Sequence, residues 1–131
     1  REEQIDDTLS EFPVVNLDYT GRRSRWSYHV VMDDHVLQRF SALRKYDLDK
    51  GSFVDHAFPA GVFGSEPAFA PKIGARDEDD GYVVTFTTDL ENGRSECVVI
   101  DAKNFHSAPI ARIEIPARVP AGFHGTWAPL T

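Results

Sequence analysis

The stretch that decides the fold class is residues 81–102, "GYVVTFTTDLENGRSECVVIDA". Its first part, residues 81–89, alternates and is rich in β-branched and aromatic side chains, a composition typical of a β-strand. The Asn92-Gly93 pair that follows is a strong hairpin turn signal. Residues 95–102 then return as a second apolar strand. The stretch therefore predicts an antiparallel hairpin as the building unit of the chain.

Similar strand patterns occur on both sides of this hairpin. Upstream, residues 25–33, 39–49 and 51–58 favour strands, although a short helix over 39–49 is an alternative. Downstream, residues 110–116 alternate cleanly between two faces. With residues 66–71 and a closing "FHGTW", this predicts about eight short strands joined mainly by hairpins. We therefore expect an all-β antiparallel fold, either propeller blades or a β-sandwich, and no internal repeat decides between the two.

The composition excludes several classes of function. The 131 residues are 41% hydrophobic and 27% charged, as in an ordinary soluble domain, and the formal net charge is −7. Because binding to phosphate backbones needs a basic face, nucleic acid is excluded as a partner. No apolar run approaches the length of a membrane span and no signal peptide opens the chain, while membrane contact stays open.

Two local features have ordinary interpretations. Cys97 is the single cysteine, so no internal disulfide is possible and a reducing, cytoplasmic location is predicted. Its apolar neighbours indicate a buried structural residue rather than a nucleophile. The densest acidic run, residues 76–81 ("RDEDDG"), lacks the distal glutamate of a calcium-binding EF-hand loop. We expect this run to be a solvated turn.

Short motifs occur in a distinctive order along nearly the whole chain. They are "EFPVVN" (11–16), "YTGRRSRWSY" (19–28), "GSEPAFAP" (64–71) and "VPAGFHGTW" (119–127), with "DEDDGYVVTF" and "VVIDAKNF" between the last two. In this order they resemble the C-terminal part of the carotenoid cleavage oxygenase family, which includes stilbene-cleaving dioxygenases and the retinoid isomerase of the retinal pigment epithelium. The resemblance implies about two blades of a seven-bladed β-propeller with non-haem Fe(II) on its axis.

The resemblance also implies roles for one histidine and two glutamates. His124, in "GFHG", matches the last of the family's four iron-binding histidines, and Glu11 and Glu66 match glutamates that accompany such histidines. Imidazole nitrogen is a good ligand for Fe(II), and a carboxylate that accepts a hydrogen bond from the ring's other nitrogen fixes its tautomer and orientation. Gly122 and Gly125 are expected to let the backbone turn tightly toward a crowded axis.

Other residues are expected to be structural. Without the resemblance, His124 itself is more typical of a core histidine. Four more histidines match no ligand position of the family and are expected to be structural or exposed: His29, His35, His56 and His106. Phe123 and Trp127 are expected to pack in the core, with the lining of a substrate tunnel as the alternative. The arginines of residues 22–25 are expected to form salt bridges within a loop.

The family's other three iron-binding histidines match nothing in this chain. Residues 1–131 are therefore expected to be the C-terminal fragment of an oxygenase, with little iron affinity and no turnover on their own. The implied partners are the missing N-terminal part, O2, and a small apolar conjugated substrate (a carotenoid, apocarotenoid or stilbenoid) cleaved to two carbonyl products. The alternative is a non-catalytic β domain used for binding or assembly, and in either case unpaired strand edges favour association.

Overall fold

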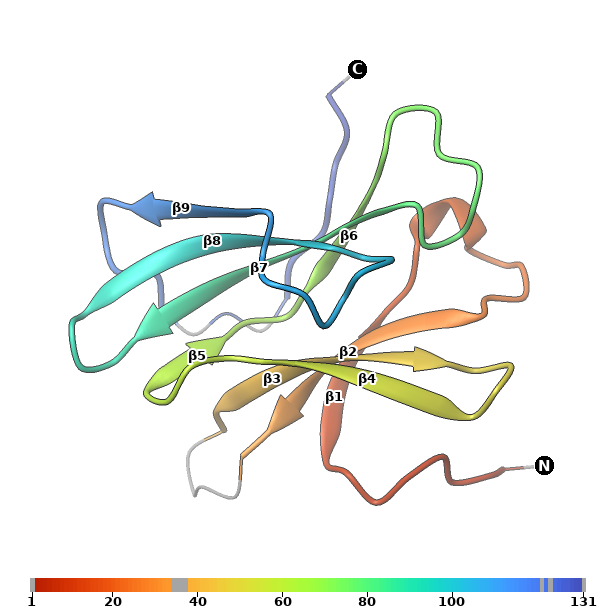
Figure 1. Ribbon diagram of the computed structural model, residues 1–131, viewed down its shortest axis with the longest axis horizontal. Coiled ribbons are helices and arrows are strands. Elements are labelled where there is room, and N and C mark those ends of the chain that lie inside the picture. Colours follow the sequence, from red (N-terminus) through yellow and green to blue (C-terminus); the bar gives the residue numbers. More distant parts are fainter. Residues whose placement is uncertain (1, 34–37, 121, 123, 131) are drawn as a thin grey trace.

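The polypeptide forms two antiparallel β-sheets that face each other (Figure 1). The computed structural model describes residues 2–33, 38–120, 122 and 124–130. Within these residues there are nine strands, close to the eight expected, and one short 3-10 helix, η1 (Leu17–Tyr19). The prediction of an all-β antiparallel fold is confirmed, and residues 39–49 form a strand rather than a helix.

The first sheet, sheet A, is a simple meander in which each strand pairs with the next. Its strands, in spatial as well as sequence order, are β1 (Ser10–Val14), β2 (Trp26–Met32), β3 (Phe40–Asp47) and β4 (Ser52–Ala57). The β3–β4 turn contains Gly51 at φ 62°, a left-handed conformation that glycine adopts without steric cost. A bulge between Glu11 and Val14 breaks the register of β1 against β2. Sheet A is therefore regular except at this bulge and at a register shift between Val31 and Met32, where β2 pairs with β3.

The second sheet, sheet B, is built around the hairpin that opened the sequence analysis. Its strands are β5 (Val62–Gly64), β6 (Ala68–Pro71), β7 (Gly81–Asp89), β8 (Arg94–Asp101) and β9 (Ala111–Ile115). The long strand β7 pairs with β8 on one side and, on the other, with β5 near its end and β6 near its start. The β7–β8 hairpin is confirmed, with a four-residue loop from Leu90 to Gly93.

The core lies between the two sheets. Its buried members are Tyr28, Val30, Phe40 and Leu43 from sheet A and, from β6–β8 and the loop that follows, Phe69, Val83, Val98, Ile100, Ala102 and Phe105. The rings of Tyr28 and Phe69 stack across the interface with centroids 5.4 Å apart. Along β2 and β8 the core residues alternate with neighbours on the opposite, outer face. Phe40 and Leu43 of β3 are three positions apart, because the register against β2 shifts near Phe40.

The acidic run of residues 76–81 joins the sheets, so the prediction of a solvated turn is wrong for much of it. The Glu78 carboxylate accepts hydrogen bonds from the backbone N–H groups of Arg25 and Trp26 at the start of β2. Asp79 pairs at 2.7 Å with Lys45, whose side chain is buried and also donates to the Ala102 carbonyl. A buried ammonium needs such partners, because an unpaired charge away from water is costly.

The predicted closing strand is absent from the described part of the C-terminal segment. After β9, the described residues up to Leu130 form no strand. The segment is held by separate hydrogen bonds: the Val119 N–H donates to Ser95 Oγ, and the Val119 carbonyl accepts from Thr88 Oγ1. A backbone ladder needs a partner strand, and the outer strands of this chain do not supply one here.

Candidate functional site

The site begins where the strand that pairs with β7 is interrupted. Between β5 and β6, Pro67 has no N–H to give to a ladder. Side chains replace the missing ladder: the Ser65 hydroxyl donates to the Phe86 carbonyl, and the Thr85 hydroxyl donates to the Ser65 carbonyl at 2.8 Å. This arrangement fixes Ser65 in a buried position and sets the place of the next residue, Glu66.

Glu66 meets His124 at this interruption, although the two residues are far apart in sequence. Glu66 Oε2 lies 3.4 Å from His124 Nδ1. The same oxygen accepts a 2.7 Å hydrogen bond from the Gly125 backbone N–H, so the carboxylate anchors the segment as well as the ring. The Glu66 side chain is 12% exposed and the imidazole 80% exposed. The ring therefore projects from the chain with one nitrogen turned to a fixed carboxylate.

Phe12 contacts the other side of this pair and is a residue that the sequence analysis missed. Its ring packs edge-on against the His124 imidazole, with centroids 5.3 Å apart, and against Phe40 at 5.6 Å. Phe12 has φ 54°, the only positive φ at a non-glycine residue in the described part of the chain. Such a conformation costs on the order of 1 kcal/mol or more. The "EFP" motif in the sequence contains Phe12, but the sequence analysis gave a role only to the glutamate of that motif.

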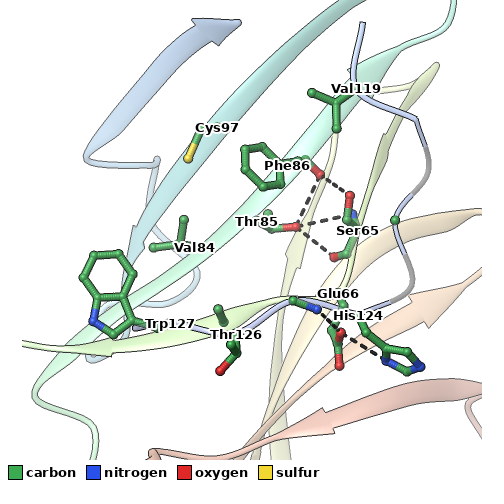
Figure 2. A pocket seen from close by; sticks show the side chains of 13 residues that line it. Ser65, Glu66, Val84, Thr85, Phe86, Cys97, Val119, His124, Thr126 and Trp127 are labelled. Carbon is green, nitrogen blue, oxygen red and sulfur yellow. Dashed lines mark hydrogen bonds and ion pairs between the residues drawn. The ribbon is translucent and has the colours of Figure 1, made fainter. Parts of the chain in front are cut away.

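Beside the pair lies a largely apolar pocket of about 320 Å³ (Figure 2). Its wall combines the β5–β6 interruption, the middle of β7 and β8, and the C-terminal segment. Figure 2 shows Glu66 and His124 at one end, with Trp127, Val84 and Cys97 toward the other. The pocket is therefore suited to an apolar molecule. The His124 imidazole and the Glu66 carboxylate give one end of the pocket its polar character.

The two glutamates named from the sequence occupy different places. Glu66 lies against His124, as described above. Glu11 is exposed on β1, opposite Val30 of β2, and the structure records no contact between it and His124. Glu11 lies on the edge strand β1, whereas Glu66 lies in the interruption between β5 and β6. Of the two predicted glutamates, the structure therefore brings Glu66 to His124.

The crowding expected at the two glycines around His124 does not come from the described residues. Gly125 has no positive φ, and a Cβ on Gly122 or Gly125 would meet no described atom within 4 Å. Close approach within this chain requires glycine at Gly64, where a Cβ would clash with the Phe58 ring. The expected crowding concerns blades other than those of this chain, and it stays a prediction.

Three other predictions from the sequence have mixed outcomes. Trp127 is 44% exposed and not in the core, which contradicts the expectation of core packing. Cys97 is only half-buried, and partial burial raises the pKa of its thiol. The arginine prediction is confirmed for Arg25, which forms two hydrogen bonds with Asp47, and for Arg23, which pairs with Asp49. Phe123 and His35 lie outside the described residues.

The remaining described histidines are structural or exposed, as expected. His56 is buried, and its Nδ1 lies 3.0 Å from the Phe105 carbonyl. His29 lies 2.8 Å from the Ser27 hydroxyl. Burial lowers the pKa of both rings, which favours their neutral forms. His106 is exposed. None of the three approaches His124 in the recorded contacts.

The described residues supply one suitable ligand for a metal ion but not a complete set of ligands. No group of three or more histidine, cysteine, aspartate or glutamate side chains is arranged to hold a metal ion among the residues the structure describes. The His124–Glu66 pair nevertheless has the form of a metal-binding imidazole supported by a carboxylate. With Nδ1 turned to Glu66, Nε2 is the nitrogen left for a metal. The chain thus supplies one suitable ligand.

Comparison with known proteins connects this geometry with a family. Residues 1–129 match the family described as retinal pigment epithelial membrane protein. The chain is 34% identical to carotenoid 9,10(9',10')-cleavage dioxygenase 1 of Pisum sativum, over 94% of this chain and 25% of that protein. It is 31% identical to lignostilbene-alpha,beta-dioxygenase isozyme III of Sphingomonas paucimobilis, over 95% of this chain and 28% of that protein.

Solved structures give the same result. A crystal structure of a D477G ACO/RPE65 chimera superposes with a TM-score of 0.88 at 30% identity, over 96% of this chain and 26% of that chain. The cobalt-substituted Synechocystis ACO superposes with a TM-score of 0.86 at 31% identity, over 95% and 26%. Fold and site therefore define the class: an all-β chain that forms part of a β-propeller, with an imidazole–carboxylate pair at a sheet edge.

The chain belongs to the carotenoid cleavage oxygenase family, the retinal pigment epithelial membrane protein family of the match above. The resemblance noted in the sequence is thereby confirmed. The chain spans about a quarter of the length of the curated relatives it matches. Among the described residues, no helix has the length and apolar character needed to cross a bilayer.

Proposed function

We propose that this chain is the C-terminal part of an Fe(II)-dependent dioxygenase that cleaves a conjugated alkene of a carotenoid, apocarotenoid or stilbenoid into two carbonyl products. The observation that carries the proposal is the contact of His124 Nδ1 with Glu66 Oε2, 3.4 Å apart, at the end of an apolar pocket. Its support is the family, whose members compared above include carotenoid- and lignostilbene-cleaving dioxygenases.

In this proposal His124 holds the iron through Nε2. Glu66 accepts the hydrogen bond of the Nδ1–H, which fixes the neutral tautomer and the direction of the ring. The Gly125 N–H holds the carboxylate in place by donating to the same oxygen. Iron, when bound, supplies the activation of O2 that oxidative cleavage of an alkene requires. The apolar lining of the pocket excludes water from the conjugated substrate.

Glu11 has the same function toward a different imidazole in this proposal. It is exposed, it stands on the edge strand β1, and it has no recorded contact with His124. Its partner is one of the three ligand histidines that the rest of the fold supplies. The His124 ring is 80% exposed. This supports a site whose ligands are divided between this chain and the rest of the fold, because a histidine that binds a metal together with residues outside this chain must project from it.

A chimera tests the proposal directly. This chain replaces the matching stretch of the Synechocystis apocarotenoid oxygenase, and iron content and alkene cleavage are measured. We expect His124→Ala to lose both, and Glu66→Gln to lower iron affinity by roughly 10–100-fold. The matched control is His106→Ala, because His106 is exposed and remote from the pocket. Retention of full iron content by His124→Ala contradicts the proposal.

The chain by itself is expected to bind iron weakly and to turn over no substrate, because one imidazole is a poor site for Fe(II). Equilibrium dialysis of the isolated chain against Fe(II) measures this. Tight stoichiometric binding by the isolated chain is the result that contradicts the division of ligands between this chain and the rest of the fold. The partner in the proposal is accordingly the remaining N-terminal part of the same enzyme, in the cytoplasm.

A second candidate function is a non-catalytic binding or assembly domain. The observation that favours it is the apolar outer face of sheet B, where Phe86, Ile113 and Trp127 are 44%, 56% and 44% exposed. Exposed apolar patches of this kind are typical of surfaces that bind another protein. A chimera that folds with normal stability but holds no iron would favour this second function.

A further inference from the structure

We propose that Phe12 is a positioning residue for His124, and that its ring holds the imidazole against Glu66. The inference deepens the proposed function, since it rests on His124 as an iron ligand. The imidazole is 80% exposed, and among the described residues the side chains of Glu66 and Phe12 contact its ring. Glu66 contacts Nδ1 and Phe12 packs edge-on at 5.3 Å. A ring with so little surrounding protein depends strongly on each contact.

The backbone at Phe12 supports a functional rather than a purely structural role. Phe12 has φ 54°, a region that side chains other than glycine rarely occupy. The strain falls within the bulge between Glu11 and Val14, and bulges re-aim side chains at the edge of a sheet. A regular β1 would pair residue by residue with β2 and would not need this conformation. The strained conformation coincides with the contact between Phe12 and His124.

The packing behind Phe12 makes its ring a firm support. Phe40, which is buried in the core, contacts the Phe12 ring edge-on at 5.6 Å. The chain of contacts therefore runs from the core through Phe40 and Phe12 to His124. Glu66, which also contacts the ring, is fixed by the Gly125 N–H. The imidazole thus contacts two supported groups, an arrangement that holds a ligand in one rotamer before metal binds.

Nuclear magnetic resonance of the isolated chain tests the contact without metal. The His124 ring signals are assigned by their loss in His124→Gln, and proximity to the Phe12 ring is measured by cross-relaxation. We expect cross-peaks in the wild type and in Phe12→Tyr. In Phe12→Leu we expect the His124 signals to move to the positions of an unstructured histidine. Phe53→Leu is the matched control, because it removes a half-exposed phenylalanine ring from sheet A that has no recorded contact with Phe12 or His124.

A second arm measures metal affinity in the chimera with Synechocystis apocarotenoid oxygenase. We expect Phe12→Leu to weaken Fe(II) binding by about tenfold in chelator competition, while Phe12→Tyr and Phe53→Leu bind as the parent does. If Phe12→Leu does not fold, Phe12→Gly replaces it, because glycine accepts a positive φ without strain. The glycine variant removes the ring and relieves the backbone together.

The outcomes separate this inference from the proposed function. Unchanged His124 signals in Phe12→Leu, or equal loss of metal affinity in Phe53→Leu, overturn the positioning role even when the chimera binds iron. A parent chimera without iron overturns the proposed function, and the resonance experiment on the isolated chain still decides whether Phe12 positions the ring. Loss of the signals and of affinity in Phe12→Leu, with rescue in Phe12→Tyr, supports the inference.

Discussion

The outer faces of the two sheets differ in polarity and in how far other residues of the chain cover them. On sheet A the outer face is a polar ladder across three strands: Ser27, Tyr46 and Phe53 in one row and His29, Arg44 and Asp55 in the next. The N-terminal segment covers it, with Tyr46 donating to Asp6 at 2.6 Å and Arg44 donating to Thr8 at 2.7 Å. Arg44 also donates twice to Asp55. These contacts cover much of this face, although Phe53 is 48% exposed.

On sheet B the outer face is apolar and partly open. One row joins Val84, Val99 and Ala111, and the next joins Phe86, Cys97 and Ile113. A pocket of about 680 Å³ lies over it, with Trp127 on its edge. Among the described residues, the C-terminal segment crosses this face, through the hydrogen bonds of Val119. Sheet A is therefore covered largely by polar contacts, whereas the outer face of sheet B stays apolar and partly exposed.

The largest expected effect is on the outer face of sheet A, at Arg44. Its guanidinium is 6% exposed and lies between Asp55 and Asp6. Arg44→Ala leaves both carboxylates without their cation, so we expect a loss of about 3 kcal/mol in the free energy of unfolding. Denaturant titration followed by circular dichroism measures it. Arg23→Ala is the control, because the Arg23–Asp49 pair is exposed and should contribute less than about 1 kcal/mol. Equal losses of unfolding free energy in Arg44→Ala and Arg23→Ala would show that the buried ion pairs of sheet A contribute no more than an exposed pair.

A charge on the open face should affect assembly more than folding. Ile113 is 56% exposed, so we expect Ile113→Asp to change the stability of the isolated chain by less than about 1 kcal/mol. In the chimera, the same carboxylate is buried without a partner and should destabilise the protein by about 2 kcal/mol. Thermal melts of both proteins give the two values. If the isolated chain loses as much as the chimera, Ile113 belongs to this chain's own core and sheet B is not open.

Acid should weaken the outer face of sheet A first. The hydrogen bond from Tyr46 lowers the pKa of Asp6 to about 2, with smaller contributions from Thr8 and Arg44. A carboxyl group with a lowered folded-state pKa stabilises the fold above its ordinary value of 3.8. That contribution is lost as the pH falls from about 4 to about 2, and we expect it to be about 1 kcal/mol after solvent screening. In Tyr46→Phe the pH dependence in this window should be smaller, as urea unfolding at pH 5 and pH 2.5 would reveal.

Much of the fold follows from local pattern. Alternation along residues 81–89 and the Asn92-Gly93 turn predicted the β7–β8 hairpin, and the pairing in the structure follows it. The failures have a common cause. The acidic run was expected to face water, yet Glu78 and Asp79 bind groups more than thirty residues away in sequence. The alternation of apolar and polar residues predicts the secondary structure of a segment, but it does not show which distant residues the segment will contact.

The candidate site was predictable only in part for the same reason. The motifs named His124 and Glu66, and the structure brings them together. No local pattern indicated that Phe12 would take a positive φ and contact the imidazole, because that conformation depends on a bulge against β2. Trp127 was expected in the core because aromatic residues usually are buried. It lies instead on the outer face of sheet B and is 44% exposed.

The smallest expected effect concerns the reactivity of Cys97 on the open face. Its thiol is half-buried, and burial raises its pKa, so less of the reactive thiolate is present at neutral pH than for a free cysteine. We expect the isolated chain to react with a thiol reagent several-fold more slowly than free cysteine, and the chimera more slowly again, because the partner surface covers the Phe86–Cys97–Ile113 row. Equal rates in the isolated chain and the chimera mean that nothing packs over this row. In that case the outer face of sheet B stays open in the assembled protein as well, and its apolar character requires another explanation than the missing part of the fold.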